Sequence, residues 1–426
     1  MSLPREVEYR VSSLPPEVST SAYVSRAVNG GGNFTTGQQV QVNLIQNRGC
    51  YLIPSSMYAT FNINVTADAA DTNVLLGLPG VSVIERSDVF LNSTSVDTIN
   101  NYNSIVNMLY NGKLGVSEKM GLSKCLGNEF VQNAANEVDS RTIVAASGAN
   151  ILSVAVPLAN ILSLQSTLWP LDSAEARIYL TIADILNISC KNDGTASTLS
   201  LFSVSDFQIH YKAVTFDAQT DMLIKSQVQP DGQIYFKSES YQSSVANLPT
   251  GSAGSQNLVF ANSLTSIKSL QTQFCRADRF KLGSGASYNP NFTQFSYQVG
   301  GRNYPQTPLS SSADAAVTLE FLESIHGIMS HPDAAQTSMS VNNFRGLNDA
   351  FGNDSFKDLP KAYFGYNSER LPSNSALNGI SSQNSNIVVR VDIGAATTTT
   401  ATCLQIFHHD CILKYDPIAN SMVVMR

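Results

Sequence analysis

The chain has 426 residues and a net charge of −7, with 14% charged and 43% hydrophobic residues. An ordinary soluble protein carries about 25% charged residues, so uncharged polar residues replace the missing charge here. This composition supports a large core and excludes intrinsic disorder, and the acidic balance argues against binding nucleic acid through charge, because phosphate neutralisation requires Lys and Arg.

The start of the chain predicts no secretion signal. Met1–Arg10 has no apolar h-region, and no stretch of the sequence approaches the roughly 18 apolar residues of a membrane span. The six cysteines show no metal-like spacing and are expected to be reduced thiols in the core. We therefore expect a protein that is made inside the cell.

Residues 1–25 are predicted to form an N-terminal arm. Its charge is mixed up to residue 20, with two basic and three acidic residues: Arg5, Arg10, Glu6, Glu8 and Glu17. A coat protein that packages nucleic acid directly usually needs a basic arm. The interpretation favoured here is a segment that docks under or between neighbouring subunits, and the alternative is a disordered tail.

Alternation of apolar and polar residues predicts β-strands along most of the chain. The clearest are Ile178–Ile182, Phe207–Ala213 and Ile387–Ile393. Gly300-Gly301 is predicted to be a hairpin turn, and Asn420-Ser421 another. Further strand-like stretches are Val40–Gln46, Met57–Val65, Val81–Leu91, Leu152–Val156, Gly232–Ser238, Ser266–Phe274, Phe295–Arg302, Cys403–Tyr415 and Met422–Arg426.

Only two helices are predicted with helical spacing throughout. The first places the apolar residues of Ile99–Tyr110 on one face, with Asp97 as the cap and Gly112 as the end. The second spans Asp314–His326. A short apolar turn is expected at Ala159–Leu168, and the low-charge stretch Ser243–Gln256 is interpreted as a loop.

The domain boundary is placed near Phe216–Ile224, after the long strand that ends at Val214. Residues 26–216 and 217–426 then form two halves, each with about seven or eight strands and one notable helix. The predicted fold class is therefore all-β, with a pair of tandem β-sandwiches. No repeat at the level of residues relates the halves.

Several of these stretches, taken in order, resemble the double jelly-roll major capsid proteins of polinton-like viruses, virophages, large eukaryotic DNA viruses and adenovirus-lineage viruses. In the first half, the matching segments are Val83–Asn92 followed by Ile99–Leu109, then Val154–Ser163 with Trp169-Pro170-Leu171 and Ala176–Leu186, and then Val204–Lys212. In the second half, they are Tyr297-Gln298, Tyr304-Pro305 with the helix Asp314–His326, and the closing strands Cys403–Asp416 and Ser421–Arg426.

The resemblance implies two tandem eight-stranded jelly rolls with a few short helices in connecting loops. It implies a homotrimer, a pseudo-hexagonal capsomer that tiles an icosahedral virion shell inside the infected host cell. Its partners would be neighbouring capsomers, penton and minor capsid proteins. Genome packing would be left to other proteins, or an internal membrane or core layer would intervene, and no direct sequence-specific nucleic-acid binding is expected.

No enzyme is predicted, and we assign no catalytic residue, cofactor or metal site, because GxSxG, GxxxxGK[ST], HExxH and GxGxxG are all absent. The densest group of potential ligands is His408-His409-Asp410-Cys411. On a strand, His408 and Asp410 would share one face and His409 and Cys411 the other, whereas zinc needs three or four converging ligands. Hydrogen-bonded histidines near a subunit contact are the favoured interpretation, with a pH dependence of assembly as a hypothesis.

Two alternatives remain open at this point. One is a capsid protein with a single jelly-roll shell domain and a protruding β-domain, which a basic arm would have favoured. The other is a non-viral, glycan-binding β-sandwich protein. Carbohydrate sites usually expose aromatic side chains, and the single tryptophan, Trp169, precedes a proline within an apolar stretch and gives that alternative little support.

Overall fold

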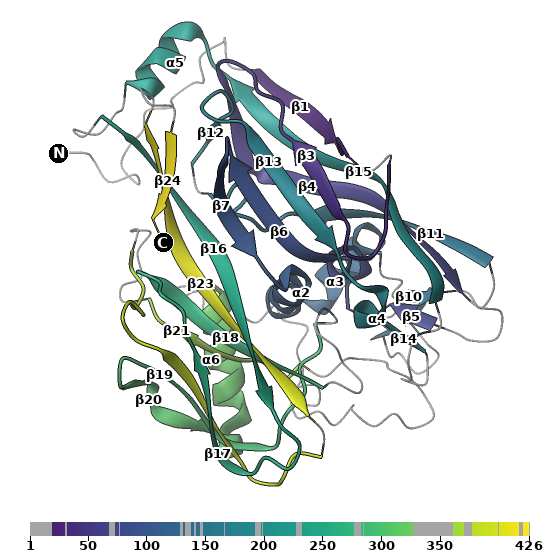
Figure 1. Cartoon of the computed structure of the whole chain (residues 1–426), viewed down its shortest axis with the longest axis vertical. Coiled ribbons are helices and arrows are strands. Elements are labelled where there is room, and N and C mark those ends of the chain that lie inside the picture. The colour runs from purple at the N-terminus through teal and green to yellow at the C-terminus, as the bar shows by residue number, and fades with distance from the viewer. Residues whose placement is uncertain are drawn as a thin grey trace.

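The computed structural model describes residues 19–29, 32–67, 73–75, 77–127, 131–132, 138–139, 142–144, 148–165, 167–191, 197, 199–226, 232–276, 283, 285–326, 361–369, 377–398, 400–416 and 421–425. Residues 1–18 of the predicted arm, and His331, lie outside these ranges. Two β-sandwiches lie side by side, and the long strands β16 and β23 run between them (Figure 1).

The first sandwich consists of two antiparallel sheets. The β15 sheet has the order β1 (Ser19–Arg26), β15 (Leu199–Thr215), β4 (Cys50–Ala67) and β11 (Gly148–Pro157), with β2 (Asn33–Phe34) on β15 and β12 (Trp169–Pro170) on β4. The β13 sheet has the order β3 (Gln39–Asn43), β13 (Ala176–Ile182), β6 (Ile84–Leu91) and β7 (Thr94–Ile99). Two small sheets flank them, made by β10 (Thr142–Val144), β5 (Asn73–Leu75) and β14 (Ser189–Lys191), and by β8 (Val131–Gln132) and β9 (Val138–Asp139).

The second sandwich also has two antiparallel sheets. The β23 sheet has the order β16 (Ile234–Leu248), β23 (Ala401–Asp416), β18 (Ile267–Arg276) and β21 (Phe364–Asn367), and β24 (Ser421–Met425) pairs with β23. The β22 sheet has the order β17 (Gly254–Phe260), β22 (Ile387–Ile393), β19 (Phe292–Val299) and β20 (Arg302–Ser310).

The two sandwiches share one topology. If the eight main strands of each are counted in chain order, one sheet runs first, eighth, third, sixth and the other second, seventh, fourth, fifth. A closed pair of four-stranded sheets in this order is a jelly roll. The predicted fold class, two tandem eight-stranded jelly rolls, is therefore confirmed, and the similarity between the halves is one of architecture.

Helices occur in the connections. They are α1 (Pro79–Ser82), α2 (Tyr102–Lys113), α3 (Val116–Leu126), α4 (Ile185–Ile188), α5 (Ala218–Lys225) and α6 (Asp314–His326), and the short turn η3 (Ser311–Ala313) precedes α6. The second predicted helix is confirmed over its full span. None of the helices in the described ranges is long and apolar enough to cross a membrane.

The prediction for the first helix is wrong at both ends. Asn101, in a left-handed conformation at φ 51°, precedes α2, and Gly112 lies inside the helix instead of ending it. Asp97 is not a cap, because it belongs to β7 and is buried there. Its carboxylate forms hydrogen bonds in the contact between the sandwiches instead.

The prediction of a loop at Ser243–Gln256 is also wrong. β16 continues to Leu248 and β17 begins at Gly254, so most of this stretch is strand. The pairing of β16 with β23 is regular from Ile234 with Tyr415 to Leu248 with Ala401, and this long ladder overrides the low strand propensity of the Ser-rich sequence.

At the domain boundary, β15 ends at Thr215 and α5 leads into the second sandwich. β1 pairs along its whole length with β15, from Ser19 with Thr215 to Arg26 with Gln208. Residues 19–25, which the sequence assigned to the arm, are therefore part of the first sandwich's sheet.

Candidate functional site: the contact between the two sandwiches

The two jelly rolls are joined by a continuous apolar contact. Trp169 of β12 is fully buried and packs on Phe236 of β16, with ring centroids 4.7 Å apart. One buried cluster combines the core of the first sandwich with apolar residues of the second: Phe236, Tyr241, Phe321, Leu322, Tyr363, Leu404, Ile406, Cys411, Leu413 and Met422. Burying this much apolar surface favours one fixed arrangement of the two sandwiches over independent motion.

Buried hydrogen bonds also join the two sandwiches, and they are directional where the apolar packing is not. Ser240 Oγ of β16 donates to Asp97 Oδ1 of β7 at 2.5 Å, and the Ile161 backbone N–H donates to Asp97 Oδ2 at 3.0 Å. Ser238 Oγ donates to the Ile161 carbonyl at 2.5 Å. Nearby, Asn101 Nδ2 donates to Ser243 Oγ at 3.1 Å. Small polar side chains along β16 thus meet the end of β7 and the turn that follows β11.

A second set of polar contacts connects α2 with the segments before β19 and before β21. Asn107 Nδ2 donates to the Gly283 carbonyl at 3.2 Å, and the Gly283 N–H donates to Ser104 Oγ at 2.8 Å. Gly283 has φ 101°, and an added Cβ would fall 2.6 Å from Asn103 Nδ2, so the close approach requires glycine. Asn111 Nδ2 donates to Tyr363 OH at 2.9 Å.

Charged groups gather where the β23 sheet faces the end of α2. Lys268 Nζ lies 2.5 Å from Glu239 Oε1 and 3.2 Å from Glu369 Oε1, and His408 Nε2 lies 2.9 Å from Glu239 Oε2. Burial alone would raise the pKa of Glu239, but the hydrogen bond with His408 and the charge of Lys268 outweigh it and hold the pKa well below its usual range. Lys113, at the end of α2, is close enough to this cluster for the charges of Glu239 and Lys268 to act on it in opposite directions.

The histidine cluster seen in the sequence lies in this region. His408 stacks on Tyr241, with centroids 4.6 Å apart, and bonds Glu239. His409 Nδ1 lies 3.4 Å from Cys411 Sγ, as expected for residues two apart on a strand. Asp410 Oδ2 accepts from Ser266 Oγ at 2.6 Å. Within the described part of the chain, no three His, Cys, Asp or Glu side chains come together as metal ligands.

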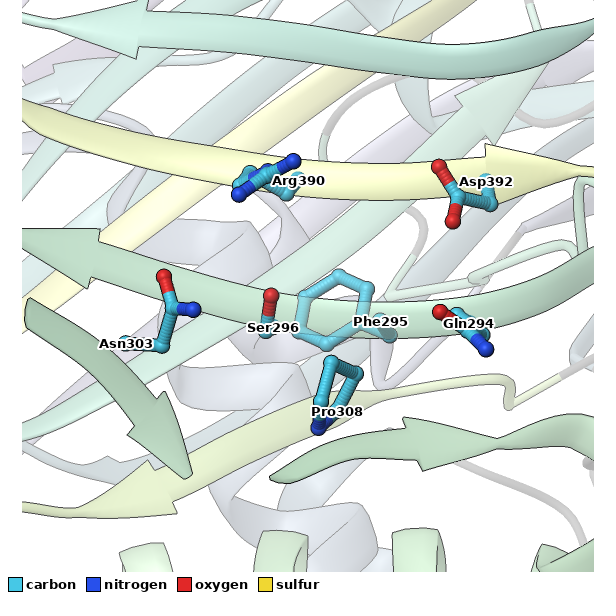
Figure 2. A pocket seen from close by; sticks show the side chains of 7 residues that line it. All are labelled: Gln294, Phe295, Ser296, Asn303, Pro308, Arg390 and Asp392. Atoms are coloured by element: carbon cyan, nitrogen blue, oxygen red, sulfur yellow. The ribbon is translucent and has the colours of Figure 1, made fainter. Parts of the chain in front are cut away.

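A shallow polar pocket of about 70 Å³ opens on the outer face of the β22 sheet. Figure 2 shows Arg390 and Asp392 on one strand beside Gln294 and Ser296 on the next, and the lining is completed by Phe295, Asn303 and Pro308. The pocket exists because the pairing of β20 with β19 is interrupted between Tyr304 and Leu309. Its lining thus combines one arginine and one aspartate with neutral polar and apolar side chains.

Sequence reasoning missed the residues that join the sandwiches. The sequence predicts Asp97 as a helix cap, and it predicts a loop from Ser243 onwards, where β16 continues. The available signal was the alternation of Lys237 and Glu239 with Ser238 and Ser240 in a strand-like stretch. Small polar side chains on a strand that is buried against another domain look the same in sequence as those on an exposed strand.

No protein-family model matches the sequence, and no curated protein matches it. Solved structures do match. VP54 of PBCV-1, fitted into a cryo-EM reconstruction of the virophage Sputnik, has a TM-score of 0.62 at 12% identity, over 98% of this chain and 99% of that one.

Two further matches cover almost the whole chain. The Faustovirus major capsid protein has a TM-score of 0.59 at 9% identity, over 97% of this chain and 92% of its own. The mavirus major capsid protein has a TM-score of 0.52 at 10% identity, over 100% and 95%. At such low identities the likeness is one of fold. It confirms, for the fold, the resemblance that the order of the sequence motifs predicts. From end to end, the chain has the double jelly-roll fold of these major capsid proteins.

Proposed function

We propose that the protein is a major capsid protein that assembles as trimeric, pseudo-hexagonal capsomers tiling an icosahedral virion shell. The observation that carries this proposal is the fixed pairing of two jelly rolls of the same topology in one chain. Three such chains supply six similar sandwiches, which is the number needed for a block with a hexagonal outline. The full-length likeness to three major capsid proteins supports the same role.

The composition suits dense assembly. Only 14% of the residues are charged, and like charges at close range oppose the packing of many copies. The net charge of −7 favours leaving the genome to other proteins, or to a membrane or core layer between the shell and the nucleic acid. The partners proposed are neighbouring capsomers, penton and minor capsid proteins, with residues 1–18 docking against a neighbour.

The alternatives are less well supported. A single jelly roll with a protruding β-domain is wrong, because the second half has its own complete jelly-roll strand order. The glycan-binding alternative gains no support from Trp169, because that side chain is fully buried against Phe236. The proposed role is assembly without a chemical reaction.

Negative-stain imaging of the purified full-length protein tests the proposal. We expect blocks with a hexagonal outline and threefold symmetry. Elongated particles of the size of one chain, unchanged as the protein concentration rises, would contradict it.

A further inference from the structure

The last strand of the chain, β24, forms an edge of the β23 sheet. It pairs with the end of β23, from Ser421 with Asp416 to Met425 with Ile412. Among the strands that the structure describes, none pairs with the other side of β24 (Figure 1). A strand in this position offers a row of backbone N–H and C=O groups to a further strand.

β24 is apolar on both faces although it lies at an edge. On one face, Met422 is buried in the core cluster, and Val424 packs against that cluster. On the other face, Val423 is 53% exposed and Met425 is 40% exposed. Edge strands of natural proteins are usually protected by charged residues or proline, and strands that are apolar on both faces are usually covered on both. The sequence of β24 therefore indicates that this edge is covered in the assembled protein.

The helix α5 also exposes its large apolar side chains. Met222 is 72% exposed and Leu223 is 66% exposed. Its polar side chains instead hold it to the first sandwich, where Tyr51 OH donates to Asp221 Oδ1 at 2.6 Å. A surface helix normally turns its apolar residues towards the core, so the reversed orientation of α5 is a second sign that this part of the chain is covered by a partner.

The predicted N-terminal arm leaves the first sandwich near these two elements. Ser19, the first residue of β1, pairs with Thr215, which lies three residues before the start of α5. At the other end of α5, the charge of Lys225 acts on Tyr415 of β23, and Tyr415 pairs with Met422 of β24. The start of β1, α5 and β24 therefore lie towards the same end of the molecule (Figure 1).

The arm contains a stretch with the pattern of a strand. Residues 6–11 alternate charged and apolar side chains in the order Glu-Val-Glu-Tyr-Arg-Val, which favours a strand with one apolar face. The spacing of these apolar residues matches that of Val423 and Met425 on β24. Pro15-Pro16 separates this stretch from β1. Proline fixes φ near about −65° and disfavours a helical residue before it, so the pair favours an extended connection that reaches outwards.

We propose that residues 6–11 of a neighbouring copy in the same capsomer add as a strand to the open edge of β24, with their apolar face beside Val423 and Met425. In such a strand addition, main-chain hydrogen bonds supply affinity and alternate side chains supply specificity. Each chain has one arm and one open edge, so three chains can exchange their arms around a closed ring. The inference rests on the proposed capsomer and names the surface that receives its arms.

Photo-crosslinking of the full chain tests where the arm lies. With p-benzoylphenylalanine in place of Val423, we expect crosslinks to residues 5–12. Assembly from equal amounts of isotope-labelled and unlabelled chains, followed by mass spectrometry, should show crosslinks that join a labelled to an unlabelled chain. In protein that has the trimer mass, crosslinks to the arm of the same chain only, crosslinks from β24 to another β24, or no crosslink to the arm would each overturn the proposal.

Hydrogen exchange tests whether the arm pairs as a strand. Tyr9→Asp places a carboxylate on the apolar face of residues 6–11, and we expect the outward-pointing amides of β24 to exchange at least about tenfold faster than in the wild type. The matched control is Ser2→Asp, which adds the same charge to the arm outside the alternating stretch. The control should keep the exchange rates of the wild type, and equal rates in all three proteins would contradict the strand addition.

The outcomes separate the inference from the proposed function. A wild-type trimer in which the edge of β24 exchanges freely would overturn the strand addition and leave the capsomer proposal standing. A wild type that is monomeric at every concentration would overturn the capsomer, and the arm exchange with it.

Discussion

Ser240 and Asp97 are hydrogen-bonded at 2.5 Å across the contact between the two jelly rolls, and both side chains are buried. The same carboxylate accepts the backbone N–H of Ile161. One side chain therefore connects β7, β16 and the turn after β11, three segments that are far apart in the sequence. This arrangement makes Asp97 a structural residue of the contact.

Replacing Asp97 by alanine should destabilise the protein. The Ser240 hydroxyl and the Ile161 N–H would lose their acceptor in a buried region, and each unsatisfied donor costs about 1–3 kcal/mol. Denaturant unfolding of the full chain measures the effect. The control Asp392→Ala removes a carboxylate from the polar pocket on the β22 sheet, and it should change stability by no more than about 0.5 kcal/mol. Equal losses in the two variants would contradict this role of Asp97.

Trp169→Ala should weaken the apolar part of the contact. Removing a fully buried tryptophan leaves a cavity against Phe236, and such changes cost about 3–5 kcal/mol. Trp169→Phe keeps an aromatic ring at this position and should retain a large part of the stability. Thermal unfolding distinguishes the two variants, and a loss as large for phenylalanine as for alanine would contradict this role of aromatic packing against Phe236.

Acid should weaken the charge cluster at Glu239. The folded protein holds the pKa of this carboxyl below its ordinary value of 4.5, so its contribution to stability is fully present above that pH and is lost as the pH falls towards the folded pKa. Glu239→Gln should therefore lower stability at pH 7 and flatten the decline below about pH 4.5. Unfolding midpoints measured from pH 7 to pH 3 test this expectation, and parallel curves for the two proteins would refute it.

Gly379→Ala should be strongly destabilising. An added Cβ would collide with the backbone carbonyl of Ile267, where the main chain cannot yield, and overpacking of this kind costs about 1–3 kcal/mol or more. The matched control is Gly121→Ala on α3, where the Cβ meets nothing within 4 Å and alanine favours the helix by about 1 kcal/mol. The two variants should shift the melting temperature in opposite directions. A Gly379→Ala protein as stable as the wild type would contradict the packing described here.

Much of the fold could be predicted from sequence because its strands alternate regularly. The strand Ile387–Ile393 and the helix Asp314–His326 have the predicted bounds, since each has one clearly apolar face. The predicted strands Ile178–Ile182 and Met57–Val65 are confirmed, although the first begins earlier, at Ala176, and the second extends at both ends, from Cys50 to Ala67. Strand ends depend on cross-strand partners that are distant in sequence, so local pattern does not fix them.

The contact between the sandwiches could not be predicted in the same way. In the sequence, Asp97 precedes a helical pattern, as a capping residue would. Its carboxylate instead accepts a hydrogen bond from Ser240, which lies 143 residues later in the chain. The Ser-rich end of β16 resembles a loop until its pairing with β23 is known. α5 was missed because it buries no residue and therefore has no apolar face to detect.

The mass of the purified full-length protein in solution, measured by light scattering over a range of concentrations, tests the central claim most directly. Three chains of 45.9 kDa give about 138 kDa, and we predict this mass with little change on dilution. A single species at the mass of one chain, at every concentration, would contradict the account of this protein as a self-assembling capsomer.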